Sequence, residues 1–133
     1  MDDLAMGLLR ATMGAVFIAH GWPKIFRKAD TGHGPRRTEK LLRSKGVPYP
    51  AAVALLAGYV ETLCGILLIV GLATRVAVIP LILVLILAIP MVKWKQGFVD
   101  GWDWPFTLII VGVVILLAGP GQVSVDALVG WAG

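Results

Sequence analysis

Two ionisable side chains, Arg10 and Glu61, lie inside long apolar stretches of this 133-residue sequence, and their charges are opposite. Burying an unpaired charge costs several kcal/mol, so such residues indicate a structural ion pair or a functional site. At about 1.5 Å rise per residue, Arg10 is expected roughly 9 Å and Glu61 roughly 16 Å below the same membrane face. An arginine stem can bridge that difference. The sequence therefore predicts that these two side chains pair.

Small residues flank Glu61 at helical spacing, which favours close approach of a second helix to this face. They are Ala57, Gly58, Cys64 and Gly65. A matching stripe on the first apolar stretch consists of Arg10, Gly14, Phe17, Gly21 and Lys24. Both charges are therefore expected to face the interior of a bundle. Two readings remain open: a pair that sets helix register, or a polar site for a small ligand, a proton or a quinone headgroup.

His20 and Lys24 are four residues apart at the end of the first apolar stretch, so in a helix they share one face. Both can line one end of a bundle, although a single histidine at a membrane boundary is more commonly a hydrogen-bonded interfacial residue. The candidate polar site therefore comprises Arg10, His20, Lys24 and Glu61. The sequence assigns no catalytic residue.

The sequence contains one cysteine, Cys64. A single cysteine excludes an internal disulfide, a Cys-x-x-Cys redox pair and a cysteine-based iron–sulfur or zinc site. We therefore predict no metal site and no intrinsic cofactor. Redox chemistry would have to come from a partner or from a bound quinone.

Four apolar stretches must position these residues: 4–22, 52–72, 76–92 and 104–119. Each is close to the roughly 17 to 25 residues that cross a hydrocarbon core. The whole chain is 58% hydrophobic and 15% charged, against about 25% charged in soluble domains. Because backbone groups in lipid must bond internally, these stretches are expected to be helices. We predict an all-α integral membrane four-helix bundle that forms a single domain over residues 1–133.

A long basic loop separates the first two predicted helices, since residues 23–50 carry eight lysine and arginine side chains. Lys93 and Lys95 follow in the next loop on the same side, whereas Arg75 is the one basic residue predicted on the opposite side. The positive-inside rule then places both loops in the cytoplasm and both termini outside the inner membrane. This distribution accounts for the net charge of +4 without a nucleic-acid partner.

Within this loop, residues 38–45 are predicted to form a short interfacial helix with Leu41 and Leu42 in the headgroup layer. The basic side chains of the loop are expected to lie near anionic lipid. Docking of a soluble partner is the alternative role of the same surface.

The chain also carries a series of short motifs in a fixed order. They are Arg10, His20-Gly21-x-x-Lys24, Gly58-x-x-Glu61-x-x-x-Gly65, Gly71-x-x-Thr74-Arg75, Gly101-Trp102-Asp103 and Gly119-Pro120-Gly121-x-x-Ser124-x-Asp126. Together they resemble the DoxX family of small four-helix membrane proteins over nearly the whole chain. The resemblance implies a link to thiosulfate:quinone oxidoreductases or to membrane-associated oxidoreductase assemblies. Other relatives act as accessory or chaperone-like membrane proteins.

We therefore expect an accessory or quinone-linked subunit of a membrane-associated redox complex that is not catalytic alone. Its expected partners are the lipid bilayer and other membrane or soluble redox subunits, and the sequence leaves a homo-oligomer open. Two alternatives come from other functional classes. One is a transporter of a small molecule or proton that uses Glu61, and the other is a membrane scaffold that recruits a soluble partner through the basic loop.

Overall fold

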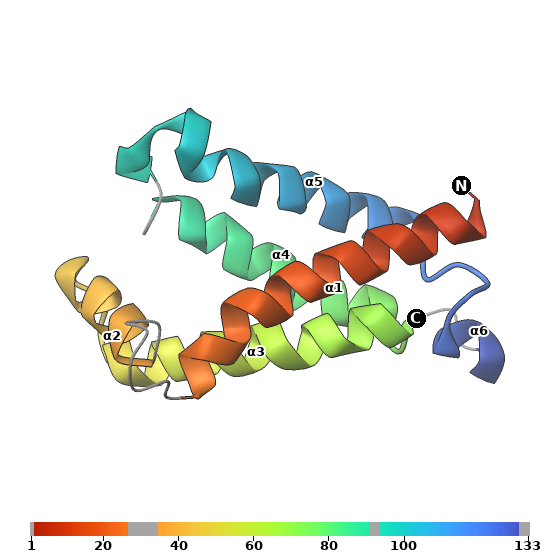
Figure 1. Cartoon of the computed structure of the whole chain (residues 1–133), viewed down its shortest axis with the longest axis horizontal. Coiled ribbons are helices and arrows are strands. Elements are labelled where there is room, and N and C mark those ends of the chain that lie inside the picture. The colour runs from red at the N-terminus through yellow and green to blue at the C-terminus, as the bar shows by residue number, and fades with distance from the viewer. Residues whose placement is uncertain (1, 27–34, 91–93, 131–133) are drawn as a thin grey trace.

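A computed structural model describes residues 2–26, 35–90 and 94–130 of the chain, and over these residues the protein is all-helical (Figure 1). The all-α prediction is therefore confirmed. The helices are α1 (Asp3–Ile25), α2 (Pro35–Ser44), α3 (Pro50–Val70), α4 (Thr74–Ala88), α5 (Asp103–Ala118) and α6 (Val125–Val129). Two short helical turns, η2 (Trp94–Gln96) and η3 (Phe98–Trp102), precede α5.

Three helical segments are long and apolar enough to cross a membrane: Asp3–Ile25, Pro50–Val70 and Phe98–Ala118. The fourth, α4, has 15 residues, which corresponds to about 22 Å of helix. This is shorter than a hydrocarbon core of about 30 Å. The apolar helices confirm the membrane class of the fold, while the count of four spans stays a prediction.

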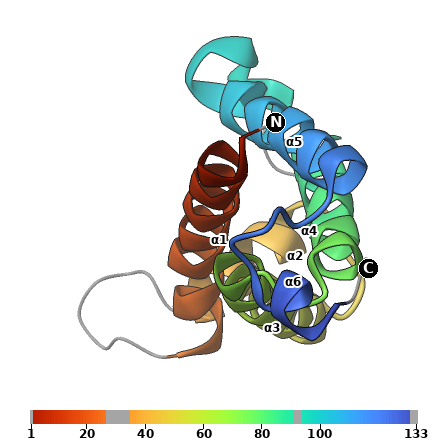
Figure 2. The same cartoon turned by 90° about the vertical axis from the view of Figure 1, so that its right-hand side faces the viewer.

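The long helices form two antiparallel pairs, α1 with α3 and α4 with α5, and the contact of α3 with α4 joins the pairs (Figures 1 and 2). The carboxyl end of α1 and the amino end of α3 lie at the same end of the molecule as α2. We call this the Lys24 end. The amino end of α1 lies at the opposite end together with α6, and we call this the Arg10 end (Figure 1).

Four glycines form the closest contact between α1 and α3. A Cβ atom on Gly14 would lie 2.5 Å from the carbonyl oxygen of Gly65, and one on Gly21 would lie 2.8 Å from that of Gly58. The spacing of seven residues on each helix keeps the glycines on one face. We call these four residues the glycine seam. The seam confirms that the small residues around Glu61 lie on the packed face of α3.

The apolar core lies between the two helix pairs. Met13 and Phe17 of α1 pack in one cluster with Leu68 of α3, Leu81 of α4 and Ile115 of α5, and all five are buried. This cluster joins residues that are up to 102 positions apart in the sequence. The core therefore holds the two helix pairs together.

Helix α2 confirms that the basic loop contains a helix, but its apolar contact differs from the predicted one. The helix packs against α3, and Leu42 is 8% exposed. Leu42 is therefore covered by the protein and not by lipid headgroups, whereas Leu41 is 38% exposed. Arg27 and Lys28 of the same predicted loop lie outside the described residues.

Candidate functional site

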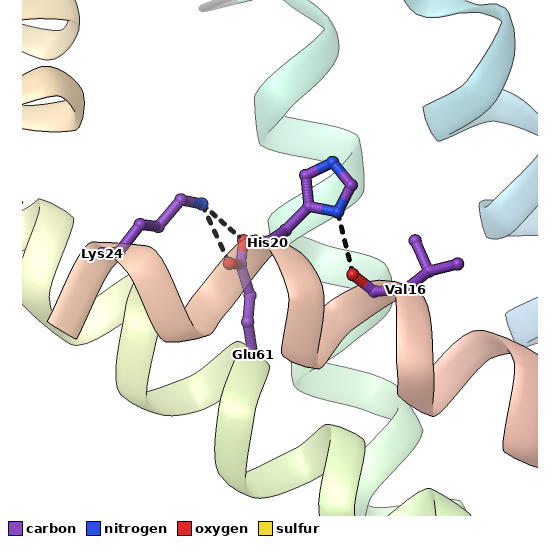
Figure 3. A network of polar contacts seen from close by, with 4 residues as sticks. All are labelled: Val16, His20, Lys24 and Glu61. Carbon is purple, nitrogen blue, oxygen red and sulfur yellow. Dashed lines mark hydrogen bonds and ion pairs between the residues drawn. The ribbon is translucent and has the colours of Figure 1, made fainter. Parts of the chain in front are cut away.

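Glu61 of α3 and Lys24 of α1 form an ion pair in which both carboxylate oxygens take part (Figure 3). The Nζ atom of Lys24 lies 2.8 Å from Oε1 and 2.9 Å from Oε2 of Glu61. The Glu61 side chain is 4% exposed, and the Lys24 side chain is 23% exposed. The carboxylate therefore lies within the helix interface, while the ammonium group lies at its edge.

The glycine seam brings these two side chains together. A Cβ atom on Gly21 would lie 2.7 Å from the Cβ of Glu61, and a Cβ on Gly58 would lie 2.8 Å from the Cβ of Lys24. Each charged side chain thus starts directly against the backbone of the opposite helix. Because helical side chains lean toward the amino terminus, Lys24 reaches back along α1 to Glu61.

His20 lies one turn before Lys24 and rises from the same side of α1 (Figure 3). Its Nδ1 atom is 2.8 Å from the carbonyl oxygen of Val16. Its ring stacks on Trp104 of α5, with 4.7 Å between the centroids and 20° between the planes. The imidazole is exposed and is held from two helices.

Arg10 lies at the opposite end of the α1–α3 pair. Its Nη1 atom donates to the carbonyl oxygens of Leu68 at 3.0 Å and Ile69 at 3.4 Å, and its Nη2 atom donates to the carbonyl oxygen of Val123. The residue is 2% exposed. Among the described residues, Arg10 forms no ion pair, and its charge is instead met by the last turn of α3 and the carboxyl-terminal segment.

The predicted pairing of Arg10 with Glu61 is therefore wrong, and helix register is the reason. The glycine seam places Glu61 level with Ile18, which is eight residues or about 12 Å from Arg10 along α1. The depths expected from the sequence differ by roughly 7 Å, which an arginine stem can span. The true register brings the amine of Lys24 to Glu61 instead.

The carboxyl-terminal segment caps the turn between α3 and α4. The Asp126 carboxylate accepts hydrogen bonds from the backbone N–H of Ala73 at 2.7 Å and of Thr74 at 2.9 Å. The N–H of Asp126 donates to the carbonyl oxygen of Gly71 at 2.9 Å. Asp126 is fully buried. Together with Arg10, it ties this segment to the ends of three helices.

The four predicted site residues thus divide into two groups. His20, Lys24 and Glu61 lie at the Lys24 end, whereas Arg10 lies in the polar cluster of the Arg10 end. Trp104 lies outside the predicted site, because its stacking on His20 depends on where α5 meets α1. Asp126 also lies outside it, and the one signal for Asp126 in the sequence is its place in the last motif.

Among the described residues, no three His, Cys, Asp or Glu side chains are placed to hold a metal ion. A cavity of about 470 Å³ lies at the Arg10 end, and its lining does not include His20, Lys24 or Glu61. The polar residues of its lining are Asp3, Arg75, Gln122 and Asp126. The cavity and the Lys24–Glu61 pair are therefore separate features of the fold.

The described residues are all helical, include three apolar helices of membrane-spanning length and carry an ion pair between two of these helices, which together define a small integral membrane protein. Comparison with known protein families shows which family this membrane protein belongs to. The DoxX family model matches residues 5–94, and the chain belongs to the DoxX family.

Two curated relatives match most of the chain. An uncharacterized membrane protein of Mycobacterium tuberculosis is 34% identical over 131 residues, which cover 89% of this chain and 77% of that protein. The "Putative oxidoreductase CatD" of Bacillus subtilis is 30% identical over 122 residues, which cover 92% of this chain and 84% of that protein. No solved structure matches the chain significantly.

Proposed function

We propose that this protein is an accessory, quinone-linked subunit of a membrane-associated redox assembly. The Lys24–Glu61 pair is its headgroup site, and His20 lies beside it. Other membrane or soluble subunits carry the redox centre with which the quinone exchanges electrons. The basic loops face the cytoplasm of a cell with an inner membrane, and both termini lie outside.

The observation that carries this proposal is the unequal burial of the ion pair. Glu61 is 4% exposed, and its charge is balanced by an ammonium group that is 23% exposed. A purely structural pair needs no accessible member, but a ligand site needs a donor that a ligand can reach. Lys24 is such a donor at the edge of an apolar helix pair.

The residues present fit the hydrogen-bonding chemistry of a quinone headgroup. A lysine ammonium group has three N–H donors, and two of them are directed to Glu61. The third has no partner among the described residues and can donate to a quinone carbonyl oxygen. A bound quinone would supply the capacity to accept and release electrons. The name of the Bacillus subtilis relative, which describes an oxidoreductase, supports the same functional class.

Quinone binding by the purified protein tests the proposal. We expect decylubiquinone to bind in detergent, and Glu61→Gln to weaken this binding about tenfold, because Lys24 then loses the charge that holds its ammonium group in place. Glu39→Gln is the matched control. Glu39 forms an exposed ion pair with Arg43 in α2, so the same chemical change there leaves quinone affinity unchanged.

Three results would contradict the proposal. They are no quinone binding, equal binding by wild type and Glu61→Gln, and equal losses in the Glu61 and Glu39 variants. Proton or solute flux through liposomes that contain this chain alone would favour the transporter alternative. Loss of a co-purifying soluble protein after neutralising Lys40 and Arg43, with quinone binding intact, would favour the scaffold alternative.

A further inference from the structure

The two nitrogen atoms of the His20 ring have different surroundings. Nδ1 lies 2.8 Å from the carbonyl oxygen of Val16, and a carbonyl oxygen only accepts hydrogen bonds. Nδ1 therefore carries the proton. In the neutral ring, Nε2 is then an acceptor, and it has no partner among the described residues. Figure 3 shows this nitrogen on the side of the ring that faces away from Val16.

Two contacts hold this acceptor in one orientation. The indole of Trp104 stacks on the imidazole at a centroid distance of 4.7 Å, which restrains the plane of the His20 ring. The hydrogen bond from Nδ1 to Val16 of α1 then selects one of the two ring orientations in that plane, since a half-turn would place a C–H group against the carbonyl oxygen. The direction of the Nε2 lone pair is therefore set by two helices.

An acceptor and a donor consequently stand next to each other on α1. His20 offers Nε2, and Lys24, one turn further along, offers the N–H that Glu61 does not use. Both side chains rise from the same side of the helix (Figure 3). A ligand that satisfies both must itself donate one hydrogen bond and accept another. A quinone carbonyl oxygen only accepts, whereas the hydroxyl group of a quinol both donates and accepts.

We propose that the site at the Lys24 end binds the reduced, hydroxyl-bearing form of its quinone in preference to the oxidised form. His20 Nε2 accepts the hydroxyl proton in a hydrogen bond, and Lys24 donates to the ligand oxygen. This inference rests on the proposed quinone-linked function. Beyond that function, it states which redox form the site prefers and names His20 as the residue responsible for the preference.

The test compares the affinities of decylubiquinol and decylubiquinone for the purified protein under argon at about pH 8. We expect wild type to bind the quinol about fivefold to tenfold more tightly, the usual effect of one additional hydrogen bond. His20→Phe keeps an aromatic ring for the stack on Trp104 but removes both nitrogens. It should bind both forms with similar affinity.

His20→Gln is the matched control, because its amide oxygen restores an acceptor without an imidazole. It should recover part of the preference for quinol. Thermal unfolding of each variant in detergent shows whether the fold is retained, and a cooperative transition is expected in each because His20 is exposed.

The outcomes separate this inference from the proposed function. A wild-type protein that binds both forms equally, or prefers the quinone, overturns the selection of quinol. A preference that persists in His20→Phe overturns the role of His20. In each of these cases the proposed function stands if Glu61→Gln still weakens binding. Absence of binding by both forms overturns the inference and the proposed function together.

Discussion

At the residue scale, the charged side chains of Glu61, Lys24 and Arg10 on the α1–α3 pair are each neutralised differently. Glu61 receives an ammonium group, Lys24 keeps partial exposure, and Arg10 is surrounded by backbone carbonyl oxygens. The guanidinium group suits the last role because it has five N–H donors in one plane. Arg10 thus satisfies carbonyl groups at the end of α3 that have no partner within the helix.

Removing Lys24 should destabilise the protein more than removing Glu61 does. Lys24→Met leaves the carboxylate of Glu61, 4% exposed, without its counter-ion. We expect this change to lower the free energy of unfolding by about 3 kcal/mol. Glu61→Leu should cost less, because the Lys24 ammonium group can turn toward solvent. Reversible unfolding in mixed micelles measures both values.

The double variant Lys24→Met/Glu61→Leu should be more stable than Lys24→Met, since it strands no charge. Lys40→Met in α2 is the control, because Lys40 is exposed, and this substitution should leave stability nearly unchanged. Additive losses in the double variant would show that the two charges do not interact.

At the element scale, the glycine seam decides how α1 and α3 pack. A glycine within a helix costs about 1 kcal/mol relative to alanine, so four of them weaken both helices. The close contact of the two backbones offsets this cost through van der Waals packing. The same contact sets the register that brings Lys24 to Glu61, so packing and site geometry have one origin.

Alanine substitutions at two glycines of α1, Gly14 and Gly7, should therefore differ in their effect on stability. A Cβ on Gly14 would lie 2.5 Å from the carbonyl oxygen of Gly65, a backbone atom that cannot move without shifting α3. We expect Gly14→Ala to destabilise the fold by about 2 kcal/mol. Gly7→Ala is the matched control, because its Cβ would meet only the Arg10 guanidinium, at 3.8 Å.

Gly7→Ala should be neutral or stabilising by up to about 1 kcal/mol, in line with helix propensity. Thermal unfolding of both variants in the same detergent makes the comparison. Similar melting temperatures for the two variants would show that the glycine seam does not determine how closely α1 and α3 pack.

At the scale of the whole molecule, the two ends have different structures. At the Arg10 end, the carboxyl-terminal segment accepts a hydrogen bond from Arg10 at Val123, caps α4 through Asp126 and lines the cavity. The Lys24 end carries α2 and the partly exposed ion pair. The proposed headgroup site thus lies at the end that carries α2, away from the cavity at the Arg10 end.

The predicted orientation places this Lys24 end in the cytoplasm, and cysteine labelling tests it. In a Cys64→Ser background, Ser44→Cys in α2 should react with a membrane-impermeant maleimide only after the cells are permeabilised. Leu128→Cys in α6, at a position that is 85% exposed, should react in intact cells. Labelling of Ser44→Cys in intact cells would reverse the orientation derived from the basic loops.

Much of this architecture could be predicted from the sequence because it follows from local and additive properties. Apolar runs of sufficient length require helices in lipid, and the packed faces of α1 and α3 follow from glycines at helical spacing. The motifs that resemble the DoxX family placed the chain in the family that the comparisons confirm. Residues of one helix turn, such as His20 and Lys24, could likewise be assigned to one site.

The partner of Glu61 was decided only by the tertiary structure. Two candidate cations, Arg10 and Lys24, lie at opposite ends of α1, and the choice depends on the register of two helices joined by a long loop. A shift of a few ångströms along the helix axis changes which of these two side chains can reach Glu61. The capping by Asp126 likewise depends on where the chain folds back across 52 residues to Thr74. Such distances are fixed by helix packing and have no counterpart in local sequence pattern.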